Sequence, residues 1–214
     1  MNIEQLLNEA ELLKRKTTLL RPDGSGTVAA HWYDVDDEEL ERTNHICWLT
    51  VDTTLIPNYS SSEKRFMTIF TNEEDCETGR VEFSDSWPDR QYTPLFPHVA
   101  DILPPIDAII ARGSSAIDPW LKDHNWDRNE RYHTGFGADV AIDKYEDLHT
   151  EQFPVYQNDG TFAVLGGWHC PGPDDDWHDL IDDQLCVVTI ENSEPWVETW
   201  LMRTGKFEIK QRIT

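Results

Sequence analysis

The spacing of apolar residues at the start of the chain predicts a helix. Asn2 can accept hydrogen bonds from the first free backbone N–H groups, and Gln5 stands three residues later, the arrangement of a capping box. Apolar residues then recur every three or four positions, and three basic residues end the pattern, where the helix dipole is negative. We therefore expect an amphipathic helix over residues 2–16 that covers a sheet, with an apolar stripe formed by Ile3, Leu6, Leu7, Ala10 and Leu13.

Most of the other regular patterns predict β-strands. The turn sequence RPDGSG separates residues 17–20 from residues 27–33 and favours a hairpin there. Further segments alternate apolar and polar residues or are rich in β-branched and aromatic ones. The last three predicted strands are joined by short turns, which is typical of an antiparallel meander. The predicted strands after the hairpin are residues 45–55, 65–71, 80–84, 161–168, 185–191, 196–202 and 206–213.

The middle of the chain has a different pattern. Several prolines between Trp87 and Pro119 are expected to exclude long regular elements. Short helices are predicted near residues 118–126, 141–152 and 174–183. The predicted fold is therefore α+β: a single domain, mainly antiparallel sheet, with an N-terminal amphipathic helix and a few short helices in the middle. A subdivision near residues 87–105 stays open, but one domain is favoured because the N-terminal strands alone would leave long edges unpaired.

Composition and charge narrow the classes of protein. The chain has 214 residues, of which 11% are aromatic, including nine tryptophans, so it is expected to fold rather than stay disordered. Its 41 acidic and 18 basic residues give a net charge of −23. Such a field repels nucleic acid and anionic membranes and attracts basic proteins. Two interpretations stay open: the acids only keep the protein soluble, or they form a face for a basic protein partner. They concentrate in residues 34–42 and 174–183.

The same sequence favours a cytoplasmic location. The N-terminus lacks the apolar stretch of a signal peptide, and no run approaches the roughly 20 apolar residues of a membrane span. The cysteines show no CxxC pair and no dense framework, so they are expected to be buried thiols. His45 and Cys47 lie two apart on a predicted strand, a weak sign of a Cys–His nucleophile. The remaining cysteines are Cys76, Cys170 and Cys186.

The candidate binding residues lie in the segment FAVLGGWHCPGPDDDW and just after it. They are Trp168, His169, Asp174, Asp175, Asp176 and His178. The residue types suit zinc, but their spacing matches neither a zinc finger nor a HExxH helix, so we expect no metal and no cofactor. The alternative is structural: Gly166 and Gly167 let a neighbouring group approach, while Trp168 and Trp177 anchor the turn to the core. The chain has neither a nucleotide-binding glycine motif nor a nucleophile elbow.

These observations favour a tryptophan-rich, acidic, cytoplasmic binding protein that engages a basic protein partner. Immunity and inhibitor proteins share this charge profile, an analogy that rests on charge alone. The alternative is a hydrolase-type enzyme with a pocket near residues 168–178, with or without a divalent metal, so whether the chain is an enzyme stays open. A structural or assembly subunit is the third hypothesis, for which a large exposed aromatic patch would be the sign.

Overall fold

A computed structural model describes most of the N-terminal half of the chain and several segments of the rest. The helices that it describes from end to end are α1, α2 and a short 3-10 helix, η1. The helices are α1 (Ile3–Leu13), α2 (Asp37–Thr43) and η1 (Thr53–Leu55). The strands are β1 (Arg15–Arg21), β2 (Ala30–Trp32), β3 (His45–Asp52), β4 (Phe66–Asn72), β5 (Gly79–Ser84), β6 (Thr93–Ile102), β7 (Ala163–Gly166), β8 (Leu185–Ile190), β9 (Trp196–Leu201) and β10 (Phe207–Arg212). The described residues are 3–60, 64–72, 79–104, 109, 144–145, 147–148, 151, 160–168, 185–190, 196–201 and 206–212.

The described strands form one sheet in the order β10-β9-β8-β7-β1-β6-β2-β3-β4-β5. Every pairing with a defined register is antiparallel. An α+β protein built mainly on an antiparallel sheet was the expectation, and this coarse description is confirmed. The meander at the C-terminal end is also confirmed, because β8 pairs with β9 and β9 with β10.

The chain divides into two compact units. One unit consists of Met1–Arg15, Asp101–Gln157 and Trp168–Asp183, and the other of Lys16–Ala100, Asn158–Gly167 and Gln184–Thr214. The second unit holds most of the sheet. One change of unit falls between Ala100 and Asp101, within the stretch where a subdivision was left open. That the chain is a single domain stays a prediction.

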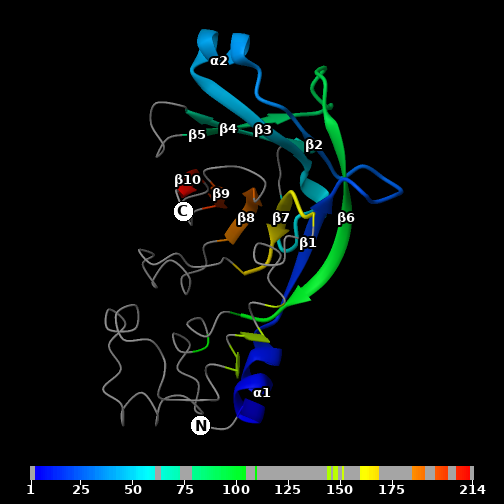
Figure 1. Ribbon diagram of the computed structural model, residues 1–214, viewed down its shortest axis with the longest axis vertical. Coiled ribbons are helices and arrows are strands. Elements are labelled where there is room, and N and C mark those ends of the chain that lie inside the picture. The colour runs from blue at the N-terminus through cyan, green and yellow to red at the C-terminus, as the bar shows by residue number, and fades with distance from the viewer. Residues whose placement is uncertain are drawn as a thin grey trace. The chain divides into compact units, whose positions relative to one another are not determined.

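The sheet in the second unit curls until its first and last strands approach each other (Figure 1). The ring of Phe83 on β5 lies 5.6 Å from the ring of Phe207 on β10. The curled sheet thereby encloses the apolar side chains of its inner face and removes them from water. Burial of apolar surface is the main favourable contribution to folding. This core includes Leu20, Leu49, Val51, Met67, Ile69, Leu95, Leu165 and Val188.

Two sequence predictions for this unit are wrong. The segments around RPDGSG do not form a hairpin, because β6 lies between β1 and β2 in the sheet. The proline-rich region does hold a long element, since β6 runs from Thr93 to Ile102 and includes Pro94 and Pro97. Its defined ladder with β2 covers three residues, in which Pro94, without an N–H group to donate, lies opposite His31.

The first unit contains α1, which ends at Leu13, three residues earlier than predicted. Leu6 and Ala10 are buried, whereas Leu12 is exposed. The described residues within the predicted helix 141–152 are helical, and the buried Tyr145 donates a hydrogen bond to the carbonyl of Pro104 at 2.7 Å. The helices predicted near 118–126 and 174–183 lie outside the described residues. Within the part of the chain that the structure describes, no helix is long and apolar enough to span a membrane.

Candidate functional site

Of the six candidate binding residues, the structure describes Trp168, which is packed. Its side chain is 4% exposed, and its indole N–H donates to the carbonyl of Leu13 at 2.9 Å. That carbonyl belongs to the last residue of α1, where backbone acceptors lack partners within the helix. The guanidinium carbon of Arg15 lies 3.6 Å from the centre of the indole ring. The contacts give Trp168 a structural explanation, while its role in binding stays a prediction.

The other five candidates lie outside the described residues: His169, Asp174, Asp175, Asp176 and His178. The binding site and the hydrolase pocket proposed for this stretch therefore stay predictions. The close approach of a neighbouring group that was expected at the paired glycines is present at Gly167, where the neighbour is Thr17. A Cβ atom placed on Gly167 would lie 2.2 Å from Oγ1 of Thr17.

The described acidic residues gather in residues 34–42, which we call the acidic segment. Asp36 is the N-cap of α2 and accepts a hydrogen bond from the backbone N–H of Glu39 at 3.1 Å. Asp37, Glu38 and Glu39 follow in the first turn, where negative charge is favoured by the helix dipole. No residue of α2 is fully buried. The sequence pattern thus produces a capped helix whose acids face water, apart from the partly buried Glu39.

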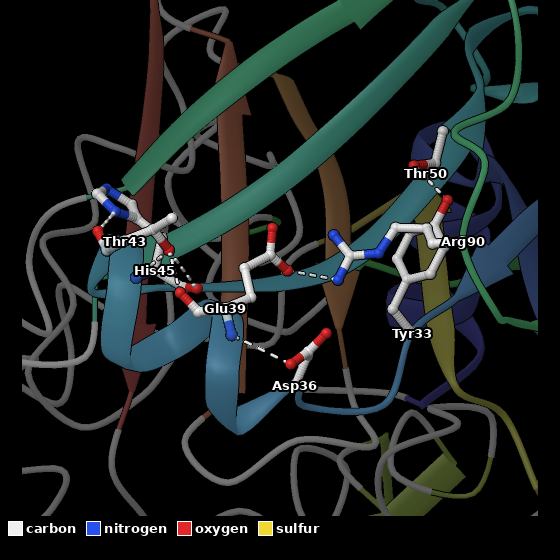
Figure 2. Close-up of polar contacts among 7 residues, drawn as sticks. All are labelled: Tyr33, Asp36, Glu39, Thr43, His45, Thr50 and Arg90. Carbon is white, nitrogen blue, oxygen red and sulfur yellow. Dashed lines mark hydrogen bonds and ion pairs between the residues drawn. The ribbon is translucent and has the colours of Figure 1, made fainter.

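The C-terminal end of α2 is fixed to the sheet. Asn44 adopts a left-handed conformation, with φ of 56°, and its N–H binds the carbonyl of Leu40 at 2.7 Å. The Asn44 amide also donates to Oδ1 of Asn72 on β4 at 3.1 Å. The Nδ1 atom of His45 lies 2.6 Å from the carbonyl of Thr43, a hydrogen bond that places the proton on Nδ1 (Figure 2).

The outer face of β2, β3 and β4 is buried, although the outer face of an antiparallel sheet is commonly solvated. The Tyr33 hydroxyl donates to Oγ1 of Thr50 at 2.9 Å, and Thr50 shares a hydrogen bond of 2.8 Å with Thr68. Burial without these partners would be unfavourable for each hydroxyl. The buried residues of the outer face include His31, Tyr33, Cys47, Thr50, Phe66, Thr68 and Phe70.

Residues 85–92, which we call the covering loop, lie over this face. The ring of Trp87 stacks on His31 at 3.9 Å and also lies 4.2 Å from the ring of Phe66. Tyr92 stacks on His31 at 3.5 Å. Arg90 places its guanidinium carbon 5.0 Å from the centre of the Tyr33 ring. The loop therefore covers the outer face with ring and cation–π contacts.

Arg90 also joins the covering loop to the acidic segment. Its Nη2 atom lies 2.5 Å from Oε2 of Glu39, and Figure 2 shows the side chain reaching toward Glu39 beside the ring of Tyr33. Both side chains are about three-quarters buried. Burial alone would lower the pKa of Arg90, but the hydrogen bond and charge of Glu39 outweigh it and raise this pKa. The pair holds α2 and the loop together.

The buried titratable groups of the outer face are held in their neutral forms. Burial raises the pKa of Tyr33 to about 12 and that of the Cys47 thiol to about 12. Burial lowers the pKa of His31 to about 4. Because a thiolate is the reactive form of cysteine, the environment of Cys47 does not favour the nucleophile considered for His45 and Cys47.

A small pocket opens beside the acidic segment, with a volume of about 250 Å³. Its size is below the roughly 300–1,000 Å³ that is usual for small-molecule sites, and its lining is mainly polar. Among the described residues, no group of three or more His, Cys, Asp or Glu side chains could hold a metal ion. The pocket is lined by Asp34, Val35, Asp36, Arg90 and Gln91.

Neither a protein-family model nor a curated protein sequence matches this chain.

The covering loop was missed because Pro88 and the prolines that follow it suggested a stretch without long regular elements. A signal was present in β4, where Met67 and Ile69 alternate with Phe66, Thr68 and Phe70. A strand with apolar residues on both sides is typical of a sheet that is covered on both faces. That pattern indicates that a second layer covers the outer face of β4, but it does not indicate which segment forms this layer.

Proposed function

We propose that this protein is a binding protein that engages a basic protein partner through the acidic segment. The segment contains six acidic residues among nine, in a chain with a net charge of −23. Asp34, Asp37, Glu38 and Glu41 are exposed, as is the side chain of Val35 beside them. This arrangement supports long-range attraction of cations at the surface.

The observation that carries the proposal is the fixed presentation of these charges. Asp36 caps the start of α2, Asn44 ties its end to β4, and Glu39 is paired with Arg90 in between. A solvated acidic loop needs none of these attachments to keep a protein in solution. A surface ordered before binding loses less conformational entropy when a partner binds, which improves affinity.

The pocket adds a place for one basic side chain of the partner. Asp34 and Asp36 are among the residues that line it, and the positive charge of Arg90 is already paired with Glu39. A lysine or arginine stem would lie against Val35 while its charged end approaches the carboxylates. A cytoplasmic location remains part of the proposal and rests on the cysteine pattern, with Cys47 a buried free thiol.

The test compares two variants that each remove four negative charges. The segment variant carries Asp34→Asn, Asp37→Asn, Glu38→Gln and Glu41→Gln, which spares the cap Asp36 and the paired Glu39. The control variant carries Asp23→Asn, Asp101→Asn, Asp147→Asn and Glu151→Gln, all of them exposed acids elsewhere. Proteins captured by the wild-type chain from its native cell extract are identified, and their association rates are measured at low and high salt.

We expect a basic partner whose association slows by about tenfold in the segment variant and by less than about twofold in the control variant. Added salt should remove most of the difference, because screening shortens the range of the attraction to about 8 Å at physiological ionic strength. Equal effects of the two variants, or an association rate that salt does not change, would contradict the proposal. The acidic segment would then serve only to keep the protein in solution.

A further inference from the structure

The imidazole of His31 is clasped between two rings of the covering loop. Trp87 stacks on one side at 3.9 Å with an angle of 15° between the planes, and Tyr92 stacks at 3.5 Å with an angle of 4°. His31 is 4% exposed, and its Nδ1 atom has no hydrogen-bond partner among the described residues. A histidine in this position contributes its ring face to packing and leaves one nitrogen unused.

Among the described residues, no carboxylate pairs with His31 in a way that would stabilise a positive charge on its ring. Tyr33 of β2 meets the ring edge-on at 6.5 Å, while Thr50 of β3 and Pro94 of β6 lie opposite in the sheet. Protonation would place a buried charge there, with an N–H at Nδ1 that has no acceptor among the described residues. Both consequences are costly in a buried site.

The charged residues of the covering loop are engaged elsewhere or face water. Asp85 pairs with Lys64 at 3.7 Å, Arg90 pairs with Glu39, and Asp89 is exposed. The pKa of His31 is accordingly lowered by burial alone, to about 4. The neutral ring is therefore the form that the closed loop accepts.

We propose that the stack of His31, Trp87 and Tyr92 is an acid-released clasp that holds the covering loop on the outer face of β2, β3 and β4. When the loop is closed, the imidazole is neutral and sandwiched. When the loop opens, the ring enters water and can take up a proton. Acid therefore favours the open loop.

Opening of the covering loop would also change the contacts of the acidic segment. The covering loop carries Arg90, so its release removes the cation from Tyr33 and the partner from Glu39. The hydroxyls of Thr50 and Thr68 would then become accessible to water. The inference concerns the protein alone and does not depend on the proposed partner.

The pH range follows from the two pKa values of His31. Its ordinary value is 6.5 and burial lowers it to about 4. Above pH 6.5 the ring is neutral in both states and the clasp has its full strength. As the pH falls from 7 to 4, the open state binds more protons than the closed state, so the equilibrium constant for opening rises by about 100-fold, toward a limit of about 300-fold at lower pH. Well below pH 4 both states are protonated and the rise stops.

The experiment measures the clasp in the intact chain. The pKa of His31 is determined by NMR titration, with its resonance assigned from a His31→Phe variant. Amide hydrogen exchange is then followed between pH 7 and 4 and converted to protection factors, with β3 as an internal reference for global unfolding. His31→Phe keeps a stacking ring that cannot titrate, and His98→Gln removes an exposed histidine as the matched control.

We expect a pKa below 6 for His31 and, between pH 7 and 4, a selective loss of protection in residues 85–92 of up to about 100-fold. His98→Gln should retain this loss and His31→Phe should not. A pKa of 6 or higher would mean that the ring faces hold the imidazolium as well as the imidazole, and would overturn the proposal. The proposal also fails if His31→Phe, when folded, opens in acid as the wild type does, or if the wild-type loop keeps its protection. If His31→Phe does not fold, the His31 resonance is assigned from its contacts with the stacked rings of Trp87 and Tyr92, and the pKa of the wild-type protein decides the matter.

Discussion

Replacing Gly167 by alanine should cost much more stability than the same change at Gly160. Both glycines have positive φ angles, +85° at Gly167 and +82° at Gly160, so alanine suffers a similar backbone strain at either position. That strain is about 1–2 kcal/mol, and the lower entropy of the unfolded alanine chain offsets about 0.4–1 kcal/mol of it. The free energy of unfolding should therefore fall by only about 1 kcal/mol in Gly160→Ala.

The difference between the two sites is the space around the new methyl group. At Gly160 no atom lies within 4 Å of the position that a Cβ would occupy, whereas at Gly167 it would lie 2.2 Å from Oγ1 and 3.2 Å from Cβ of Thr17. Thr17 is fully buried and branched at Cβ, so it cannot rotate away freely. Overpacking of this kind costs about 1–3 kcal/mol, so Gly167→Ala should lose about 2–4 kcal/mol in total.

Urea denaturation of the two variants and of Gly167→Ala combined with Thr17→Ala measures these terms. Removing the threonine hydroxyl and methyl group should recover part of the loss, with a coupling energy of about 1 kcal/mol or more. If Gly167→Ala were no less stable than Gly160→Ala, or if the double variant showed no coupling, the close approach of Gly167 and Thr17 would not exist as described.

Two further predictions concern single buried side chains. Trp168→Ala should lower the free energy of unfolding by about 3–5 kcal/mol. Trp168→Phe should lower it by less, because it keeps a ring for Arg15 and loses only the hydrogen bond to Leu13. A loss under about 1 kcal/mol in Trp168→Ala would reassign this residue to ligand binding. Cys47 should resist alkylation by iodoacetamide at pH 8 in the folded protein and react once denaturant is added, because burial raises its pKa to about 12. Peptide mapping by mass spectrometry measures the second effect, and labelling of folded Cys47 at the rate of a free thiol would refute it.

Local patterns in the sequence predicted the elements better than they predicted the neighbours of each element. The residue patterns of 65–71 and 80–84 located β4 and β5 to within one residue at each end. The position of β6 between β1 and β2 depends on contacts between residues far apart in the chain, and turn sequences do not predict such contacts. A turn sequence such as RPDGSG reverses the chain whether or not the strands on either side pair.

The candidate site likewise has features that the sequence shows and features that only the fold shows. The acids of residues 34–42 are visible in the sequence, and so is the capping residue Asp36. The pairing of Glu39 with Arg90 is not, because it joins positions 51 residues apart through a loop without periodicity. His31 likewise sits in a short strand, and only its neighbours in space distinguish it from a solvated polar residue. The segment that the sequence favoured as a site, apart from Trp168, lies outside the described residues.

The burial of β4 on both faces has a consequence for sequence variation. Its residues from Phe66 to Thr71 are all buried, with Met67 and Ile69 in the core and Phe66 against Trp87 of the covering loop. In the neighbouring β5 no residue is fully buried, so most of its side chains can change in size or charge at little cost. In β4 a larger side chain would strike either the core or the loop, and a smaller one would leave a cavity. Among variants of this protein that retain the fold, β4 should therefore change least, and a substitution there should be accompanied by one in the loop or core that faces it.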